Sequence, residues 1–324
     1  RSIFGSDTNS SFVNPWELWG LIKKNNSLTQ PGSTQITLTG DWTAIMSNVP
    51  VFMQKTGLNV DEMLDLVGMQ ILNADGHITL VPLPESKEDA VRTGDPDKFY
   101  LSSSKAWETD LVLIHRLLRL RSITGWNFQN LDSFLCTIYP TLEPSYIDLR
   151  YIHAAKAIQA RFNLSAPEIA CWWNDFSLQS GSRSGKSYFE QVFLAKRFDD
   201  ATIGLFKGIL DRSVTQLASD INASDENTST VRQALLRVLG IPVSDLNRIV
   251  ANESLKAVDL SCISTLYRVV SVANAVHLSI AEYYFMRNVF GFAAFGTPTM
   301  PLVMDDAVKR MSARGISVAQ MASL

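Results

Sequence analysis

One loop of this chain carries part of a phosphate-binding pattern. Residues 180–187 read SGSRSGKS and end in Gly-Lys-Ser. In a P-loop, backbone amides surround the phosphates, while the lysine and the serine meet the terminal phosphate and magnesium. Here Ser180 stands where the pattern requires glycine, and the preceding residues 170–176 are predicted to be helical, whereas a P-loop follows a buried strand. The sequence therefore favours a loop between helices, and a nucleotide-binding enzyme that uses Lys186 is retained only as a third alternative.

The other residue types that could carry out chemistry do not form a recognisable site. The histidines His77, His115, His153 and His277 lack cysteine or carboxylate partners at metal-ligand spacing. The adjacent pairs Asp199/Asp200 and Asp305/Asp306 point to different helix faces and are predicted to start helices or to be solvated. A Gly-x-Ser-x-Gly nucleophile elbow is also missing. We predict no catalytic, cofactor-binding or metal-binding residues, no cofactor and no enzymatic activity.

Charge and composition restrict the partners. The net charge of −3 gives no general attraction to nucleic acid. Arg116, Arg119 and Arg121 alternate with leucines, which is typical of an amphipathic helix with a solvated basic edge. No apolar run approaches the roughly 18 residues that a membrane helix needs, so we expect no membrane contact. The three cysteines, Cys136, Cys171 and Cys262, lie in helical apolar patterns; we predict buried thiols and leave a single disulfide open.

The elements that must position all these residues are marked by a recurring seven-residue phrase. Its six copies begin at residues 57, 125, 163, 240, 277 and 315, which are 68, 38, 77, 37 and 38 positions apart. Each copy starts with Gly, Asn or His, and the first position is predicted to take the left-handed conformation that ends a helix. Ser or Asn two positions later is predicted to cap the next helix.

Further positions of the phrase support the same interpretation. A Glu or Gln three residues after the cap predicts a capping box, most clearly in Ser165/Glu168, Ser279/Glu282 and Ser317/Gln320. Apolar residues before and after the cap predict hydrophobic staples at Leu58/Met63, Trp126/Leu131, Leu164/Ile169, Ile241/Leu246, Leu278/Tyr283 and Ile316/Met321. The spacing is close to one or two steps of a 38-residue unit, which is typical of helical repeats.

We therefore predict an all-α fold, an irregular solenoid-like bundle of long and short helices joined by capped turns. One short β element is expected near 34–40 or 78–83. Residues 1–324 are expected to form part of one helical domain, with a possible sub-boundary in the loop 75–100. The last phrase caps a helix at Ser317, about two turns before Leu324, and we interpret the chain as a fragment of a longer polypeptide.

Several stretches resemble the A subunit of bacterial Tc (insecticidal toxin complex) proteins. They are residues 16–20, 36–42 and 51–58; residues 114–120 with Gly125-Trp126, Leu131-Asp132 and 147–150; and residues 260–268 with Leu278-Ser279. The resemblance covers most of the chain and is weakest at 75–100 and 180–235. It rests on pattern, since no catalytic residue is involved, and His277 in place of the usual Gly is a departure from it.

This resemblance implies a structural role. In that family, such sequence forms part of an α-helical shell around a central translocation channel, in a secreted pentameric virulence factor. The implied partners are the rest of the parent toxin chain, further copies of it and, indirectly, the B and C subunits that supply the toxic enzyme. The family's receptor-binding β-domains and channel helices have no counterpart here. A free-standing helical-repeat adaptor that binds a protein partner is the alternative.

Overall fold

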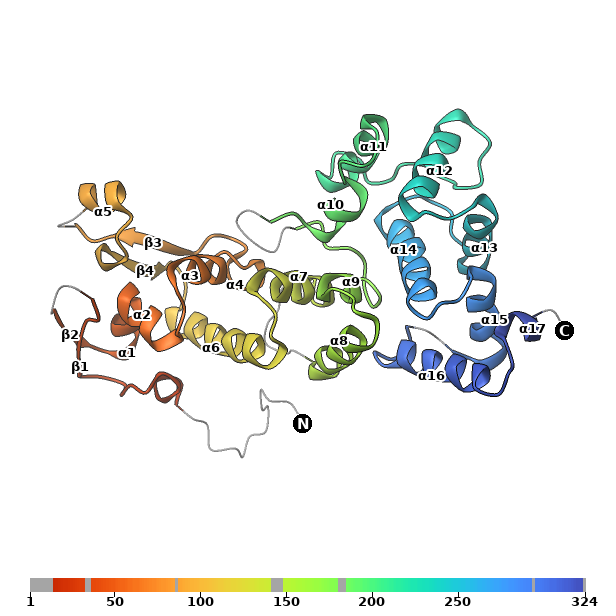
Figure 1. The fold of residues 1–324 in the computed structure, drawn as a ribbon. Helices are drawn as coiled ribbons and strands as arrows, with labels where there is room; N and C mark the ends of the chain where they lie inside the picture. The colour runs from red at the N-terminus through yellow and green to blue at the C-terminus, as the bar shows by residue number, and fades with distance from the viewer. Residues whose placement is uncertain are drawn as a thin grey trace. The chain divides into compact units, whose positions relative to one another are not determined.

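A computed structural model describes residues 14–32, 36–84, 87–140, 148–179, 185–292 and 295–322. The predicted all-α class is confirmed, because helices dominate these ranges and only two small antiparallel sheets accompany them there (Figure 1). The chain divides into two compact units. The first holds the described residues up to Asp132 together with Gly185, and the second holds the rest. The segment 75–100, where a sub-boundary is predicted, lies inside the first unit.

The first unit combines short helices with both sheets. Its elements are η1 (Pro15–Trp19), β1 (Asn26–Thr29), β2 (Thr37–Gly40), α1 (Trp42–Ser47), α2 (Val49–Thr56), α3 (Val60–Val67), α4 (Gln70–Asn73), β3 (Ile78–Pro82), α5 (Lys87–Thr93), η3 (Pro96–Lys98), β4 (Phe99–Ser103), α6 (Trp107–Thr124) and the start of α7 (Phe128–Ile138). In α6, Leu111, Ile114 and Leu117 recur at helical spacing and are fully buried. This stripe places α6 in the core of the unit.

The β structure is larger than the sequence predicts. Strands are present at both expected places, β2 and β3, but each pairs with a strand that the sequence analysis did not find. β1 pairs with β2, aligning Asn26 with Gly40, and β4 pairs with β3, aligning Ile78 with Ser103. The expected loop 75–100 is also more regular than predicted, because it contains α5 and η3 and ends in the first two residues of β4. The five residues of β4 are too few for alternation to stand out in the sequence. Residues 34 and 35 of the first expected element lie outside the described residues.

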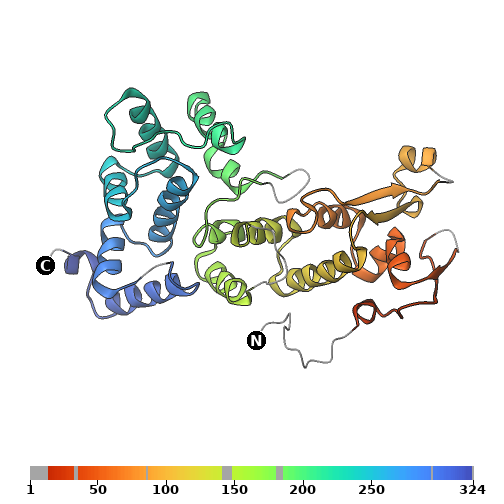
Figure 2. The same cartoon turned by 180° about the vertical axis from the view of Figure 1, so that it is seen from behind.

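In the described residues of the second unit, all the regular elements are helices. Its elements are the end of α7, then α8 (Leu149–Phe162), α9 (Ala166–Ala170), α10 (Tyr188–Phe193), α11 (Asp200–Leu210), α12 (Glu226–Leu239), α13 (Val243–Glu253), α14 (Leu260–Ala275), α15 (Ile280–Phe290), α16 (Met300–Ser312) and α17 (Val318–Ala322). Helix α14 packs against α13 and α15 (Figure 2). The wholly buried Trp172 donates from its indole Nε1 to Ser271 Oγ of α14 at 2.8 Å. Trp172 is therefore part of the core of this unit.

All six copies of the phrase form the turn that the sequence predicts. The first residue of each has a positive φ: 70° at Gly57, 68° at Gly125, 56° at Asn163, 67° at Gly240, 58° at His277 and 72° at Gly315. The departure at His277 therefore leaves the helix stop unchanged. Five of the six caps are made by side chains, each of which accepts a hydrogen bond from the amide three residues later. The capping residues are Asn59, Asn127, Ser165, Ser279 and Ser317.

The fourth and sixth copies depart from the prediction. Pro242 occupies the cap position of the fourth copy and makes no side-chain cap, because it has no acceptor to offer. In the sixth copy Ile316 is 41% exposed, so the predicted staple is not a buried contact there. Of the other five first-position staple residues, Leu58, Trp126 and Leu278 are buried, whereas Leu164 and Ile241 are half-buried.

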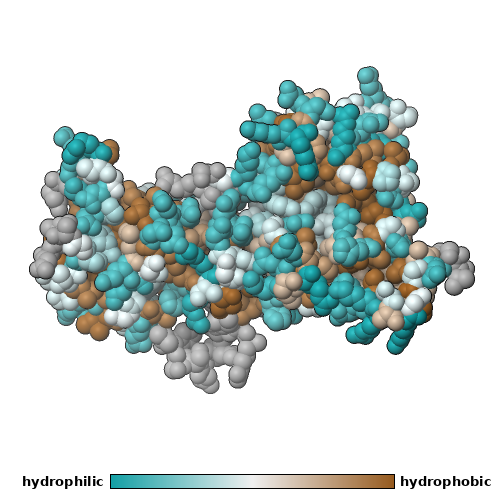
Figure 3. Space-filling model, viewed as in Figure 1, coloured by the Kyte–Doolittle hydropathy of each residue, from teal (hydrophilic) through white to brown (hydrophobic). Residues whose placement is uncertain are grey.

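The surface and the cysteines complete the description. On the face shown in Figure 3, hydrophilic residues are interspersed with apolar ones over both units. The thiols of Cys136, Cys171 and Cys262 are buried as predicted, and no disulfide joins them. Within the described ranges, no helix is both long and apolar enough to cross a membrane.

Candidate functional site

The P-loop-like segment falls mostly outside the described residues, since 180–184 are not among them. Of its last three residues, Ser187 is the N-cap of α10. Its hydroxyl accepts from the amide of Glu190 at 3.2 Å, and the Glu190 carboxylate accepts from the amide of Ser187 at 2.8 Å. Through the described residues 148–179 the chain is helix and turn, with no strand ahead of the loop. The serine that a P-loop would offer to magnesium is here engaged as a helix cap.

Three of the four histidines lie on helices or in a helix-ending turn. The ring of His115 meets Trp19 edge to face with centroids 5.3 Å apart, and burial, followed by the charge of Arg119, lowers the pKa of His115. His153 is exposed on α8, and His277 forms the turn before α15. His115 therefore contributes to packing, and His277 ends a helix.

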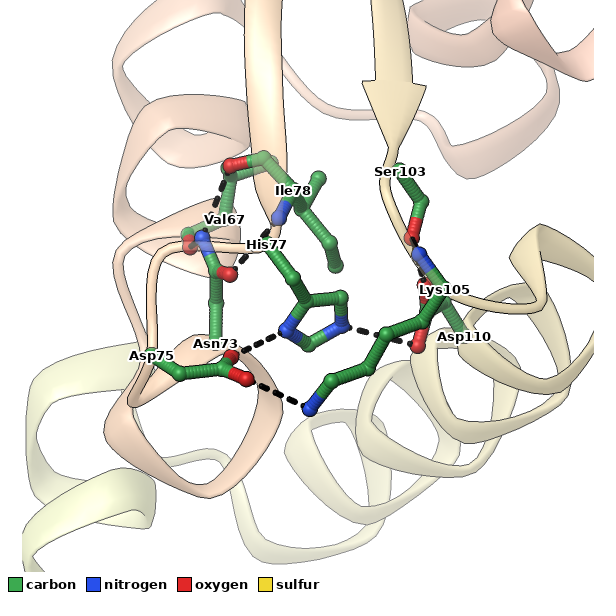
Figure 4. Close-up of polar contacts among 8 residues, drawn as sticks. All are labelled: Val67, Asn73, Asp75, His77, Ile78, Ser103, Lys105 and Asp110. Carbon is green, nitrogen blue, oxygen red and sulfur yellow. Dashed lines mark hydrogen bonds and ion pairs between the residues drawn. The ribbon is translucent and has the colours of Figure 1, made fainter.

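His77 pairs with two carboxylates, although the sequence shows no partner for it at metal-ligand spacing. Its Nδ1 lies 2.5 Å from Asp75 Oδ1, and its Nε2 lies 3.1 Å from Asp110 Oδ1 (Figure 4). Asp110 also accepts from Ser103 Oγ at 2.7 Å, and Lys105 Nζ lies 2.6 Å from the second oxygen of Asp75. Asp75 is only two residues from His77 and was visible in the sequence, whereas Asp110 is 33 residues away.

This His77 cluster contains the residue types of a catalytic triad, but not its connectivity. In a triad the serine hydroxyl bonds to the histidine, which must have one nitrogen available as a base. Here Ser103 donates to Asp110, and both imidazole nitrogens of His77 are engaged by carboxylates. The hydrogen bond from Lys105, followed by that from His77, holds the pKa of Asp75 below its usual range. The cluster therefore fixes the segment before β3 to the end of β4, to Lys105 and to the first turn of α6.

The carboxylate pairs behave differently from each other. Asp199 is the N-cap of α11 and accepts from the amide of Thr202 at 2.8 Å, as predicted. Asp305 contradicts the prediction of a helix-start or solvated residue: it lies in the middle of α16 and is 3% exposed. Arg161 and Lys309 neutralise it at 2.5 and 2.7 Å, which explains how the helix tolerates a buried carboxylate.

The basic cluster on α6 is only partly solvated. Arg121 forms an ion pair with Glu62 of α3, and its guanidinium lies 4.6 Å from the ring centroid of Phe128. Arg119 is exposed, as the predicted solvated edge requires. Arg121 thus joins α3, α6 and α7 in addition to lining a basic edge.

The sequence did not reveal a cluster of hydroxyl groups around Glu168 on α9. Tyr267 Oη and Ser271 Oγ of α14 donate to Glu168 Oε1 at 3.3 and 3.4 Å. Tyr267 Oη in turn lies 2.7 Å from Tyr188 Oη of α10. The sequence predicts a capping box between Ser165 and Glu168, and the structure has one half of it: the Glu168 amide donates to Ser165 Oγ at 3.4 Å. Tyr267 is 99 residues away in the chain, so no sequence spacing could have revealed the cluster.

The Glu168 cluster lines a cavity of about 590 Å³ in the second unit. Burial raises the pKa of Glu168, while the Tyr267 and Ser271 hydroxyls and the Ser165 amide act in the opposite direction. Burial also raises the pKa values of Tyr188 and Tyr267 beyond the physiological range, so both remain hydrogen-bond donors. This is a partly buried carboxylate held by neutral donors. In the described part of the chain, no group of three or more His, Cys, Asp or Glu residues is arranged to hold a metal ion.

These features define a class: an all-α protein of long and short helices joined by capped turns. No family model matches the chain, and no curated protein is similar to it in sequence. Among solved structures, the chain is similar to TcdA4 of Morganella morganii, determined by cryo-electron microscopy, with 14% identity and a TM-score of 0.49. The similarity covers 69% of this chain and 10% of that one, so the chain spans about a tenth of the length of TcdA4.

Proposed function

We propose that this chain is a structural segment of the α-helical shell of a secreted Tc-type toxin A subunit, and that it is not an enzyme. In this role it encloses the translocation channel and helps to deliver a toxic enzyme carried by partner subunits. The parent chain assembles as a pentamer. The sequence stretches that resemble Tc A subunits support the toxin assignment.

The observation that carries the proposal is the recurrence of one local geometry at six places. In each copy, the residues end one helix and start the next. Such turns build an extended wall of stacked helices, in which each unit buries its apolar face against its neighbours. A shell needs this kind of wall, whereas an active site needs convergent reactive groups held in one place.

The test is to express the complete reading frame that contains this sequence and to image its product by negative-stain electron microscopy. We expect a pentameric particle, much larger than this chain. A reading frame that begins near residue 1, ends near residue 324 and yields a monomer would overturn the shell assignment and favour an adaptor. For the non-enzymatic part, the chain is incubated with ATP and magnesium; we expect no phosphate release and no change in thermal stability. Turnover that depends on Lys186 would contradict this expectation.

A further inference from the structure

The cavity beside Glu168 has a polar floor and apolar walls. Helices α9, α10, α12 and α14 line it, together with the turns at Asn163 and His277. Leu239 and Val270 contribute apolar wall, whereas Gln191 and Asn274 place exposed amide groups around it. A volume of about 590 Å³ is in the range of small-molecule sites, which combine an apolar lining with a few convergent polar groups.

The hydrogen bonds at the floor all point toward one carboxylate oxygen. Ser271 Oγ accepts from the Trp172 indole at 2.8 Å, and its own hydrogen is directed to Glu168. Tyr267 has a single hydroxyl hydrogen; since it is donated to Glu168, Tyr188 must be the donor in the 2.7 Å contact between the two tyrosines. Each donor is therefore oriented to stabilise an ionised Glu168.

Glu168 nevertheless lacks a countercharge. Among the described residues, no Lys, Arg or His lies within ion-pair distance of its carboxylate, in contrast to the buried Asp305 and its two cations. Neutral hydroxyls offset only part of the cost of removing a carboxylate from water. The group that would complete this site is a cation small enough to enter the cavity.

We propose that this cavity binds a small organic amine, whose ammonium group pairs with Glu168. Tyr188 and Tyr267 line the same cavity, and aromatic residues suit an ammonium ion because their rings attract cations. Arg197 lines the cavity from an exposed position and disfavours a second positive charge, so the fitting ligand is a monoamine and not a polyamine. The proposal is independent of the shell assignment, because it concerns only residues of the second unit.

The test uses n-butylamine as the probe, titrated into the 324-residue chain and followed by saturation-transfer difference NMR. The matched neutral probe is 1-butanol, which has the same chain length and a hydroxyl in place of the ammonium. We expect saturable binding of the amine in the millimolar range, as so small a ligand allows, and weaker binding of the alcohol by at least about tenfold. Nuclear Overhauser contacts from the butyl protons are expected to the tyrosine rings.

The variant Glu168→Gln keeps an acceptor for the hydroxyls and removes the charge. It is expected to weaken amine binding at least about tenfold, which corresponds to about 1.4 kcal/mol. The matched control is Glu282→Gln, since Glu282 occupies the same position of the fifth phrase and caps α15 away from the cavity. This control is expected to bind as the unmodified chain does.

The proposal is overturned if the alcohol binds as tightly as the amine, if the amine does not bind, or if Glu168→Gln and Glu282→Gln have equal effects. The comparison of amine and alcohol on the unmodified chain decides the question even if Glu168→Gln does not fold.

Discussion

The recurring turns make a sharp prediction about glycine, because two glycines of the second unit differ in backbone conformation alone. Gly240 ends α12 with a φ of 67°, whereas Gly204 lies within α11 at an ordinary helical conformation. A methyl group added at either position meets no atom within 4 Å. The substitution to alanine therefore tests the backbone at both sites without any steric clash.

The expected changes have opposite signs. An L-residue in the left-handed region costs about 1–2 kcal/mol, and the reduced freedom of the unfolded chain returns about 0.4–1 kcal/mol of this. Gly240→Ala should therefore destabilise the native state by about 1 kcal/mol. Gly204→Ala relieves a helix-interior glycine and should stabilise it by about 0.5–1 kcal/mol.

The assay is thermal unfolding followed by circular dichroism and calorimetry, which also shows whether the two units melt separately. For a domain of 150–250 residues, 1 kcal/mol shifts the midpoint by about 2–4 °C. Gly240→Ala should melt lower and Gly204→Ala higher than the unmodified chain. Equal shifts of the same sign would refute the assignment of the phrase as a left-handed helix stop.

Three further substitutions test other contacts by the same unfolding assay. The carboxylate of Asp132 accepts hydrogen bonds from the first two amides of α4, at 2.8 and 3.0 Å. Asp132→Ala should therefore lower the free energy of unfolding by about 2–4 kcal/mol, and Asp132→Asn should lower it by about half as much. Equal losses of stability in the two variants would contradict this. Ser264→Ala removes the acceptor of the Phe176 amide and should lower the free energy of unfolding by about 1–2 kcal/mol. The control Ser261→Ala, at an exposed position of the same helix, should change stability little. Similar losses in the two variants would show that the buried hydrogen bond does not stabilise the fold. Because burial raises the pKa of Glu168, the folded state binds its proton more tightly than the unfolded state, and stability falls as pH rises through the interval between the two pKa values. Glu168→Gln should therefore be more stable than the unmodified chain at pH 7 but not below pH 4.5, the ordinary pKa of a glutamate, and a difference independent of pH would exclude this cause.

Local features of the fold could be predicted from the sequence, because their causes lie within a few residues. The turn at Gly57 and the capping box of Asn59 and Glu62 depend on residues that are neighbours in the chain. The conformation at His277 was also predictable, although an L-residue is disfavoured there, because the cap Ser279 and its capping box define the turn.

Features made by distant residues could not be predicted. Strand β4 exists because β3 offers it a partner, and its own five residues carry little pattern. Asp110 reaches His77 only after β3 and β4 have brought the two segments together. The cluster at Glu168 likewise needs α9 and α14 to pack, although the two helices are about a hundred residues apart.

The six turns depend mainly on residues that are neighbours in the chain, and this has a consequence for folding during protein synthesis. Each turn takes its helix stop and its start signal from seven consecutive residues, and five of the six also contain their own side-chain cap. Each turn can therefore form soon after its residues leave the ribosome, before residues distant in the chain have been synthesised. Helices that are synthesised later, such as α14, then pack against the earlier ones and complete the cores. The turns can therefore form in the order in which they are translated.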